Sequence, residues 1–171
     1  MTDRTANLLG ALALAVTDRI EQSAHSVLGR GGETPAAVVV IGYGAGLTNN
    51  GLRRILRLSH PGTVRLVDRL AADGLVERRP GRDSREIALH LTSKGIRVRE
   101  ALLVERLSTI ASMLKVLSNA EQSDLANLLS ELLSRHKTSE LERYTLCRMC
   151  DDRVCSDCPL PTLKGAQSHA K

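Results

Sequence analysis

Residues 58–70 read Leu-Ser-His-Pro-Gly-Thr-Val-Arg-Leu-Val-Asp-Arg-Leu, and this segment carries the clearest structural signal in the sequence. Ser59 can cap a helix, and Pro61 falls in the first turn, where a missing N–H costs nothing. A helix is therefore predicted to begin near His60. Three- and four-residue spacing forms an apolar stripe of Val64, Val67, Leu70 and Ala71. The side away from this stripe, which an ordinary amphipathic helix would simply expose to solvent, carries His60, Gly62, Arg65, Asp68 and Arg69.

The neighbouring segments give this helix a context. Residues 49–56 predict a short helix that turns Leu52, Ile55 and Leu56 inward, and the few residues before His60 match helix-turn-helix spacing. After the closing pair Asp73-Gly74, residues 75–79 and 85–91 predict two strands joined by a turn at residues 80–84. Helix, turn, helix and hairpin in this order indicate a winged helix-turn-helix module.

The charge of this module indicates its partner. Residues 47–91 hold nine arginines, no lysine and five acids, so they carry +4 of the formal net charge of +5 of the whole chain. A basic helix face beside an Arg-rich hairpin matches what neutralising phosphates requires. Arginine adds the planar fork that reads guanine or enters a narrow minor groove. The sequence therefore predicts binding to double-stranded DNA.

Residues 58–95 resemble the MarR family of bacterial transcriptional regulators. The resemblance is carried by the runs at residues 63–70 and 73–78, by Asp83-Ser84-Arg85 and by the exit at residues 91–95. It implies a winged helix-turn-helix dimer, with recognition helices in successive major grooves and a wing arginine near the minor groove. It also implies that a small ligand or oxidant often releases the DNA. By position, the recognition helix is about residues 60–72, Asp83 orients the wing loop and Arg85 contacts DNA.

The chain departs from the family pattern at three positions. Arg53 stands where the first module helix usually has a small alanine. Gly51 and Gly62 are weak helix formers, each costing up to about 1 kcal/mol relative to alanine. Gly62 is either simply tolerated or lets the helix N-terminus approach the DNA backbone closely.

Specific contacts are predicted from the residue types. Arg65, Arg69 and His60 are expected to read the major groove, with Gly62 and Thr63 at the helix start. Arg82 and Arg85 are expected in the minor groove, with Asp83 beside them. Arg53, Arg54 and Arg78 are expected at phosphates.

Outside the module the chain is predicted to be helical. Residues 3–28 carry an apolar stripe, and residues 36–47, after Thr34 as cap and Pro35 as first residue, are apolar on nearly every side. Residues 94–117 and a helix opened by the capping box Ser118-Asn-Ala-Glu121 continue the pattern. The first and last helices have more apolar surface than the module can cover, so a homodimer is expected.

The expected fold is mainly α with a small β wing (α+β): a winged helix-turn-helix with long N- and C-terminal dimerisation helices. The predicted segments are a dimerisation helix and linker (1–33), the DNA-binding module (34–92), C-terminal dimerisation helices (93–143), a cysteine tail (144–160) and a disordered end (161–171). The chain has no Phe or Trp, so Leu, Val, Ile and Ala must fill its core. Its apolar runs are too short to cross a bilayer and no signal peptide is evident, so no membrane partner and a cytoplasmic location are expected.

All four cysteines lie within twelve residues, as Cys147, Cys150, Cys155 and Cys158. Two C-x2-C pairs separated by four residues can present four thiolates to one tetrahedral ion. The favoured interpretation is one zinc ion per chain at the end of the last helix. A disulfide switch coupled to DNA release, an iron–sulfur cluster and unmetallated thiols remain as alternatives.

The function predicted from these features is a sequence-specific transcriptional regulator, a repressor at a pseudo-palindromic operator, with a possible small-molecule effector. No catalytic residues are predicted. The alternative is a thiol–disulfide oxidoreductase or redox-sensing protein that uses the C-x2-C pairs. Such an enzyme normally places C-x2-C after a strand in a βαβ unit, and nothing near Tyr144 reads as a strand.

Overall fold

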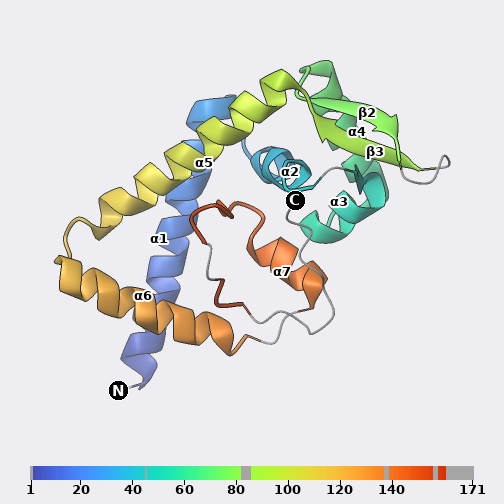
Figure 1. Cartoon of the computed structure of the whole chain (residues 1–171). Helices are drawn as coiled ribbons and strands as arrows, with labels where there is room; N and C mark the ends of the chain where they lie inside the picture. Colours follow the sequence, from blue (N-terminus) through green and yellow to red (C-terminus); the bar gives the residue numbers. More distant parts are fainter. Residues whose placement is uncertain (1, 45, 82–85, 137–138, 156–157, 161–171) are drawn as a thin grey trace.

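The structure is a computed structural model that describes residues 2–44, 46–81, 86–136, 139–155 and 158–160. Its elements, in chain order, are α1 (Thr2–Leu28), α2 (Thr34–Ile41), β1 (Leu47–Thr48), α3 (Asn49–Leu56), α4 (His60–Ala72), β2 (Val76–Pro80), β3 (Ile87–Leu91), α5 (Ser93–Leu114), α6 (Asn119–Ser134) and α7 (Glu140–Leu146) (Figure 1). Among these described helices, none is long and apolar enough to span a membrane.

Helix α2 is the centre of the fold. All eight of its residues are buried, as their uniformly apolar character predicts. Around it pack α3, β3 and α5. The largest fully buried apolar side chains come from all these elements and from α4: Leu52, Leu70, Leu89, Leu102, Leu103, Val38, Val39 and Val67. We call residues 34–91 the reading head. Helix α2 lies at the centre of its core, and α5 packs against α2.

The wing is a three-stranded antiparallel sheet of order β1-β3-β2. Val76 pairs with Leu91 and Pro80 with Ile87, while Leu47 pairs with Leu89. The two-stranded wing of the sequence prediction is therefore extended by one short strand. The expected helix over residues 36–47 was wrong at its end, because α2 stops at Ile41 and Leu47 joins the sheet.

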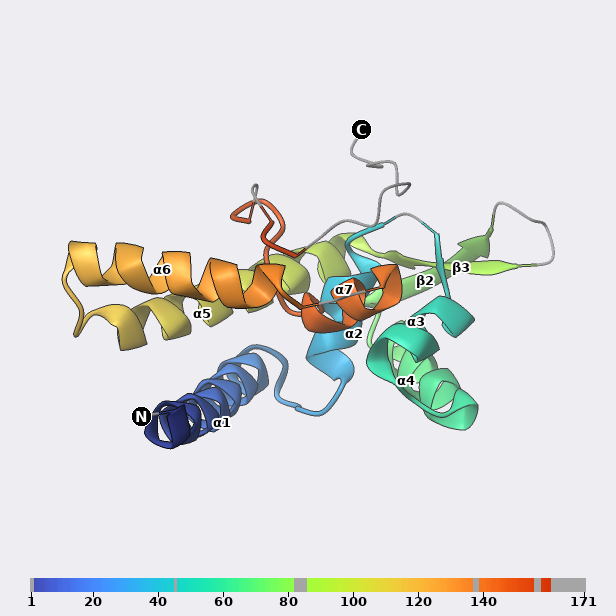
Figure 2. The same ribbon diagram turned by 90° about the horizontal axis from the view of Figure 1, so that it is seen from below.

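The long helices extend from the head. Helix α1 packs along α5, and α5 and α6 form a V whose tip points away from the wing (Figures 1 and 2). Helix α5 begins against the head, where a Cβ on Gly95 would lie 2.0 Å from the carbonyl oxygen of Leu75. Only glycine therefore lets α5 start this close to the end of α4. Ser118 and Glu121 form the predicted capping box of α6.

The outer faces of α1 and α6 leave apolar side chains in contact with solvent. Helix α6 has no buried residue at all. Its exposed leucines are Leu128, Leu129, Leu132 and Leu133, and those of α1 are Leu8, Leu9, Leu12 and Leu14. We call these two sets the leucine faces. Singly scattered apolar residues are normal on the surface of a monomer, whereas here four exposed leucines gather on each of two helices.

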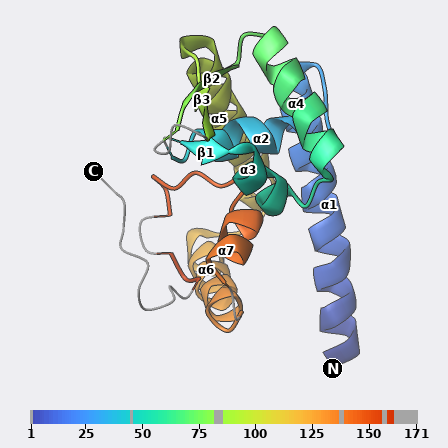
Figure 3. The ribbon, with the colours of Figure 1, turned by 90° about the vertical axis from the view of Figure 1, so that its right-hand side faces the viewer.

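Helix α7 was not predicted. It crosses the expected boundary between residues 143 and 144 and packs against α3, as Figure 3 shows. Its capping box, Ser139 with Glu142, repeats the signal that opens α6. The end expected to be disordered, residues 161–171, lies outside the described residues. The remaining architecture confirms the predicted fold class, a mainly helical winged helix-turn-helix with long terminal helices.

Candidate nucleic-acid interface

Helix α4 presents one side to solvent over its whole length. The Ser59 side chain accepts a hydrogen bond from the backbone N–H of Gly62 at 3.2 Å, and Pro61 lies in the first turn, so the helix begins where the sequence predicts. Its buried stripe is Thr63, Leu66, Val67 and Leu70. Val64 and Ala71 are only partly buried, so the packing face is rotated slightly from the predicted one. His60, Arg65 and Arg69 are all exposed on the other side.

The two residues predicted beside the helix start have local roles in the described structure. Thr63 is 1% exposed, and its hydroxyl donates to the carbonyl oxygen of Ser59 at 3.0 Å. Its side chain therefore belongs to the packed side of α4. A Cβ on Gly62 would lie 3.0 Å from the Ser59 hydroxyl, which is tight against the cap. Glycine at this position avoids a close contact with the capping side chain of Ser59.

Helix α3 supports α4 from behind. Thr48 caps α3 by accepting from the N–H of Gly51, and Leu52, Ile55 and Leu56 are buried. The turn to α4 passes through Arg57, which has a positive φ of 55° and an exposed side chain. A left-handed residue at a helix end lets the chain reverse sharply. The pair α3 and α4 thus forms the predicted helix-turn-helix.

The basic residues around α4 differ in how free they are. Arg54 is exposed, whereas the Arg53 guanidinium donates to the Asn50 side-chain oxygen at 3.0 and 3.2 Å. On the wing, Arg78 pairs with Asp68 of α4 at 2.5 Å. This exposed pair connects β2 to α4. Arg82, Asp83 and Arg85, predicted at the wing tip, lie outside the described residues.

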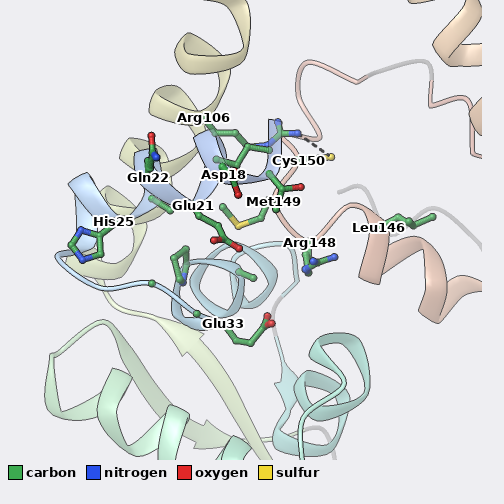
Figure 4. A pocket seen from close by; sticks show the side chains of 17 residues that line it. Asp18, Glu21, Gln22, His25, Glu33, Arg106, Leu146, Arg148, Met149 and Cys150 are labelled. Carbon is green, nitrogen blue, oxygen red and sulfur yellow. Dashed lines mark hydrogen bonds between the residues drawn. The ribbon is translucent and has the colours of Figure 1, made fainter. Parts of the chain in front are cut away.

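A cavity of about 540 Å³ lies between α1, the start of α2 and the segment after α7. Figure 4 shows its lining, with Arg106 of α5 reaching Cys150 at the rim. Acidic side chains of Asp18, Glu21 and Glu33 and basic side chains of Arg106 and Arg148 line it together with apolar groups such as Met149. The cavity is therefore amphipathic.

The four cysteines follow α7 directly, and all are free thiols. We call residues 147–158 the cysteine segment. In its first pair, a hydrogen bond from Cys147, aided by Arg106 and Arg148 and opposed by burial, lowers the pKa of Cys150 to about 6. The same hydrogen bond, together with burial, raises the pKa of Cys147. Burial and the neighbouring Cys158 and Cys150 raise the pKa of Cys155.

The two cysteine pairs do not form a metal centre among the described residues. Within the described parts of the chain, no three His, Cys, Asp or Glu side chains are placed to share one metal ion. The predicted four-thiolate site therefore stays a prediction.

Three functional candidates escaped the sequence prediction because their roles depend on distant residues. The hydroxyl of Tyr43 donates to the carbonyl oxygens of Cys147, at 2.9 Å, and Cys150. The guanidinium of Arg99 lies 5.2 Å from the centre of the Tyr43 ring, within cation–π distance. Arg106 reaches the Cys150 sulfur at 4.0 Å. No local pattern marks any of these contacts, which join positions more than forty residues apart.

Comparison with known proteins agrees with this geometry. The model of the MarR family matches residues 34–86, which are nearly the whole reading head. MarR of E. coli in its apo form shares 25% identity, over 73% of this chain and 96% of its own, with a TM-score of 0.61. RV1404 of Mycobacterium tuberculosis shares 21% identity, over 81% of this chain and 96% of its own, with a TM-score of 0.71. A MepR mutant of S. aureus bound to an oligodeoxyribonucleotide shares 21% identity, over 76% of this chain and 96% of its own, with a TM-score of 0.59. A search of curated protein sequences finds no match.

These findings show which proteins the chain is similar to. The family match covers the helix-turn-helix with strands β1 and β2, and the structural likeness extends beyond this range. The matched family consists of transcriptional regulators and not of enzymes. Over residues 34–86 the chain is similar to the MarR family, and its fold is similar to that of MarR of E. coli.

Proposed function

We propose that the chain is a repressor that binds a pseudo-palindromic operator as a homodimer. The observation that carries this proposal is the exposed side of α4, where His60, Arg65 and Arg69 face solvent while the opposite side is packed into the head. A helix held rigidly from behind, with basic side chains in front, fits the major groove of a duplex. Among the relatives, the S. aureus MepR mutant is bound to an oligodeoxyribonucleotide, which supports the same partner for this chain.

The homodimer accounts for the leucine faces. Leu12 of α1 is 50% exposed and Leu132 of α6 is 57% exposed in the single chain. Covering both faces with a second copy removes apolar surface from water, at a gain of about 25 cal/mol per Å². A two-fold axis through these helices also sets the two α4 helices about one turn of DNA apart, so the operator is a pseudo-palindrome.

Each basic residue has a distinct part in this proposal. Arg65, Arg69 and His60 read base edges, and Arg82 and Arg85 enter the minor groove with Asp83 orienting the loop. Arg53, Arg54 and Arg78 bind phosphates. The ion pair of Arg78 with Asp68 leaves the remaining donors of that guanidinium available to a phosphate, because arginine has five N–H groups.

The cavity beside α1 is the proposed effector site. Its volume of about 540 Å³ suits a small molecule. It opens between α1, which belongs to the dimer region, and the start of α2, the centre of the head. A ligand held there by Arg106 or Glu21 would change how the two parts sit together and release the operator.

The cysteine segment is proposed as a metal element of this regulator, with one zinc ion held by Cys147, Cys150, Cys155 and Cys158. Zinc is favoured over an iron–sulfur cluster because the spacing of the four cysteines matches neither common cluster pattern. A disulfide switch or redox-sensing role is the second candidate, favoured by the hydrogen-bonded thiols of Cys147 and Cys150.

The test is selection of bound sequences from a randomised duplex library, followed by affinity measurements on the selected duplex. An inverted repeat should be enriched, and affinity should fall steeply with salt. Arg65→Ala should cost about 1–3 kcal/mol and relax sequence choice, whereas Arg78→Ala should weaken all duplexes about equally. Arg135→Ala removes the same charge from the end of α6 and is the matched control, expected to leave binding unchanged. Identical specificity profiles for the Arg65 and Arg78 variants would contradict the assigned roles.

A further inference from the structure

The cavity proposed as the effector site has one wall that comes from the C-terminal part of the chain. We call residues 145–150, which end α7 and follow it, the α7 turn. A molecule that fills the cavity contacts this turn as well as α1 and the start of α2 (Figure 4). The residues of the turn that line the cavity are Leu146, Arg148, Met149 and Cys150.

The α7 turn is held on the end of α2. The hydroxyl of Tyr43, two residues beyond α2, donates to the backbone carbonyl oxygens of Cys147, at 2.9 Å, and Cys150. Tyr43 and Met149 both pack against the hydrophobic core. Met149 therefore contacts the core and lines the cavity at the same time. A ligand that contacts this wall acts on a turn that is seated on the core of the reading head.

The same turn is bonded to α3. The Thr145 hydroxyl donates to the carbonyl oxygen of Ile55, in the last turn of α3, at 3.0 Å, and to that of Leu141 at the same distance. The last carbonyls of a helix have no partner within it, so this bond supplies one from another element. Helix α3 packs against α4 and leads directly into it. The α7 turn thus supports the helix that lies behind the reading helix.

One polar group in the cavity wall has no partner. The Nε–H of Arg106, on α5, is buried, and no acceptor reaches it in the part of the chain that the structure describes. Buried polar groups nearly always have a partner, so this nitrogen is available to an acceptor that a ligand brings. A terminal nitrogen of the same guanidinium lies 4.0 Å from the Cys150 sulfur, in the α7 turn. A ligand that binds Arg106 would therefore draw it away from the turn.

We propose that the α7 turn transmits occupancy of the cavity to the DNA-reading helices. A ligand in the cavity displaces the turn from Tyr43 and Ile55, and α3, without this support, no longer holds α4 in position for the major groove. A ligand can shift such an equilibrium only by binding one state better, and a group that draws Arg106 away from Cys150 favours the displaced turn. The inference rests on the proposed function and names the element through which an effector acts.

The test places a known occupant in the cavity by attaching it to Cys150. A variant that keeps this thiol alone, with Cys147→Ser, Cys155→Ser and Cys158→Ser, is treated with benzyl methanethiosulfonate. The Cys150 sulfur forms a disulfide with the benzylthio group, and methanesulfinate and a proton leave. Mass spectrometry counts the labels, and fluorescence anisotropy measures affinity for the library-selected duplex. We expect affinity to fall about five- to 150-fold, the usual range of coupling between two sites, and to return when dithiothreitol removes the label.

A second single-thiol variant is the matched control. It keeps Cys155, which is exposed and is not among the cavity-lining residues, and carries Cys147→Ser, Cys150→Ser and Cys158→Ser. Both variants lack three of the four proposed zinc ligands, so bound metal does not distinguish them. The same label on Cys155 should leave DNA affinity unchanged.

Thr145→Val tests the bond to α3 in the otherwise unchanged chain, without any label. It keeps the shape of the side chain and removes the bond to Ile55, so DNA affinity should fall although the cavity lining is intact. In the variant with Cys150 alone, the same substitution should leave the label little further effect, because both changes act on one contact. Ser112→Ala is the control, because it removes an exposed hydroxyl that bonds within α5, to Thr109, and it should leave affinity unchanged.

Hydrogen exchange followed by mass spectrometry measures the same transmission without DNA. Labelling Cys150 should raise amide exchange in α3 and α7, because the displaced turn leaves both helix ends less supported. Labelling Cys155 should not change exchange in α3.

Every other outcome decides between the claims. Complete labelling of Cys150 with unchanged affinity, in a chain that binds DNA, would overturn the proposal. An equal loss after labelling Cys155, or an undiminished effect of the label in Thr145→Val, would do the same. Failure of Cys150 to take the label would show that its sulfur is closed off from the cavity and would also overturn it. If the native chain binds no duplex at all, the proposed function fails, while increased exchange in α3 after labelling Cys150 would still support the transmission.

Discussion

Helix α2, which is almost wholly apolar, and helix α6, in which leucines alternate with polar residues, lie in opposite environments. All eight residues of α2 are buried within one chain, whereas none of the sixteen residues of α6 is. The reading head therefore completes its own core, and the long helices do not. The free energy of unfolding of the reading head should therefore be independent of protein concentration. That of α1 and α6 should depend on concentration, because a second copy must cover their leucine faces.

The strongest way to separate the two regions is to charge the leucine face. Leu132→Glu brings like charges together across the dimer axis and should give monomers with a folded head. Because two linked half-sites bind far more tightly than one, operator affinity should fall about 100-fold or more. Sedimentation velocity and anisotropy measure both effects. Asn127→Glu, on the exposed opposite side of α6, adds the same charge and should leave the dimer intact; a dimeric Leu132 variant would show that another surface joins the subunits.

The next effect belongs to the head. Leu70 of α4 is fully buried at 0% exposure, so Leu70→Ala should lower the free energy of unfolding by about 2–5 kcal/mol. Chemical denaturation should show the same loss at every protein concentration. Leu14→Ala, at a position that is 70% exposed in the single chain, provides the contrast. A loss for Leu70→Ala that varies with concentration would mean that the head depends on the dimer.

The helix-turn-helix was predictable because its determinants are local. Ser59 and the spacing of residues 60–72 define α4 without help from the rest of the fold, and the predicted bounds match the observed ones. The end of α2 was not predictable in the same way. Leu47 looks helical from its neighbours, but it pairs with Leu89, more than forty residues away. Pairing across the chain overrides a local preference.

The candidate sites divide along the same line. Arg65 and Arg69 could be named from sequence because exposure on α4 follows from its period. The contact of Tyr43 with Cys147, and that of Thr145 with Ile55, could not, because each joins segments that only the tertiary fold brings together. Helix α7 lies between these cases. Its capping box at Ser139 and Glu142 is a local signal that the prediction overlooked.

Removing one cap in each region sharpens the comparison at a smaller scale. Ser59→Ala and Ser118→Ala each delete an N-cap side chain and should each cost about 0.5–2 kcal/mol of helix stability. The first change should weaken DNA binding with the dimer unaffected, because α4 is the reading helix. The second should weaken the dimer, because α6 carries a leucine face. DNA binding and subunit association are measured for both variants. If Ser59→Ala weakened the dimer, or Ser118→Ala weakened DNA binding by the intact dimer, the two regions would not be independent.

The smallest expected effect is the pH dependence of α6. The backbone N–H and the hydroxyl of Ser118 donate to the Glu121 carboxylate at 2.8 and 2.7 Å, and these bonds lower its pKa in the folded chain. A carboxyl with a lowered pKa stabilises the fold above its unfolded pKa, of about 4.3, and this contribution is lost as pH falls through the folded value. Acid should therefore loosen the start of α6, and with it the dimer, before the head unfolds.

Glu121→Gln can keep the capping geometry but has no proton to gain. It should match the parent protein at pH 7 and show a flatter dependence of subunit association on pH below 5. An equal slope in both proteins would assign the acid sensitivity to other carboxylates.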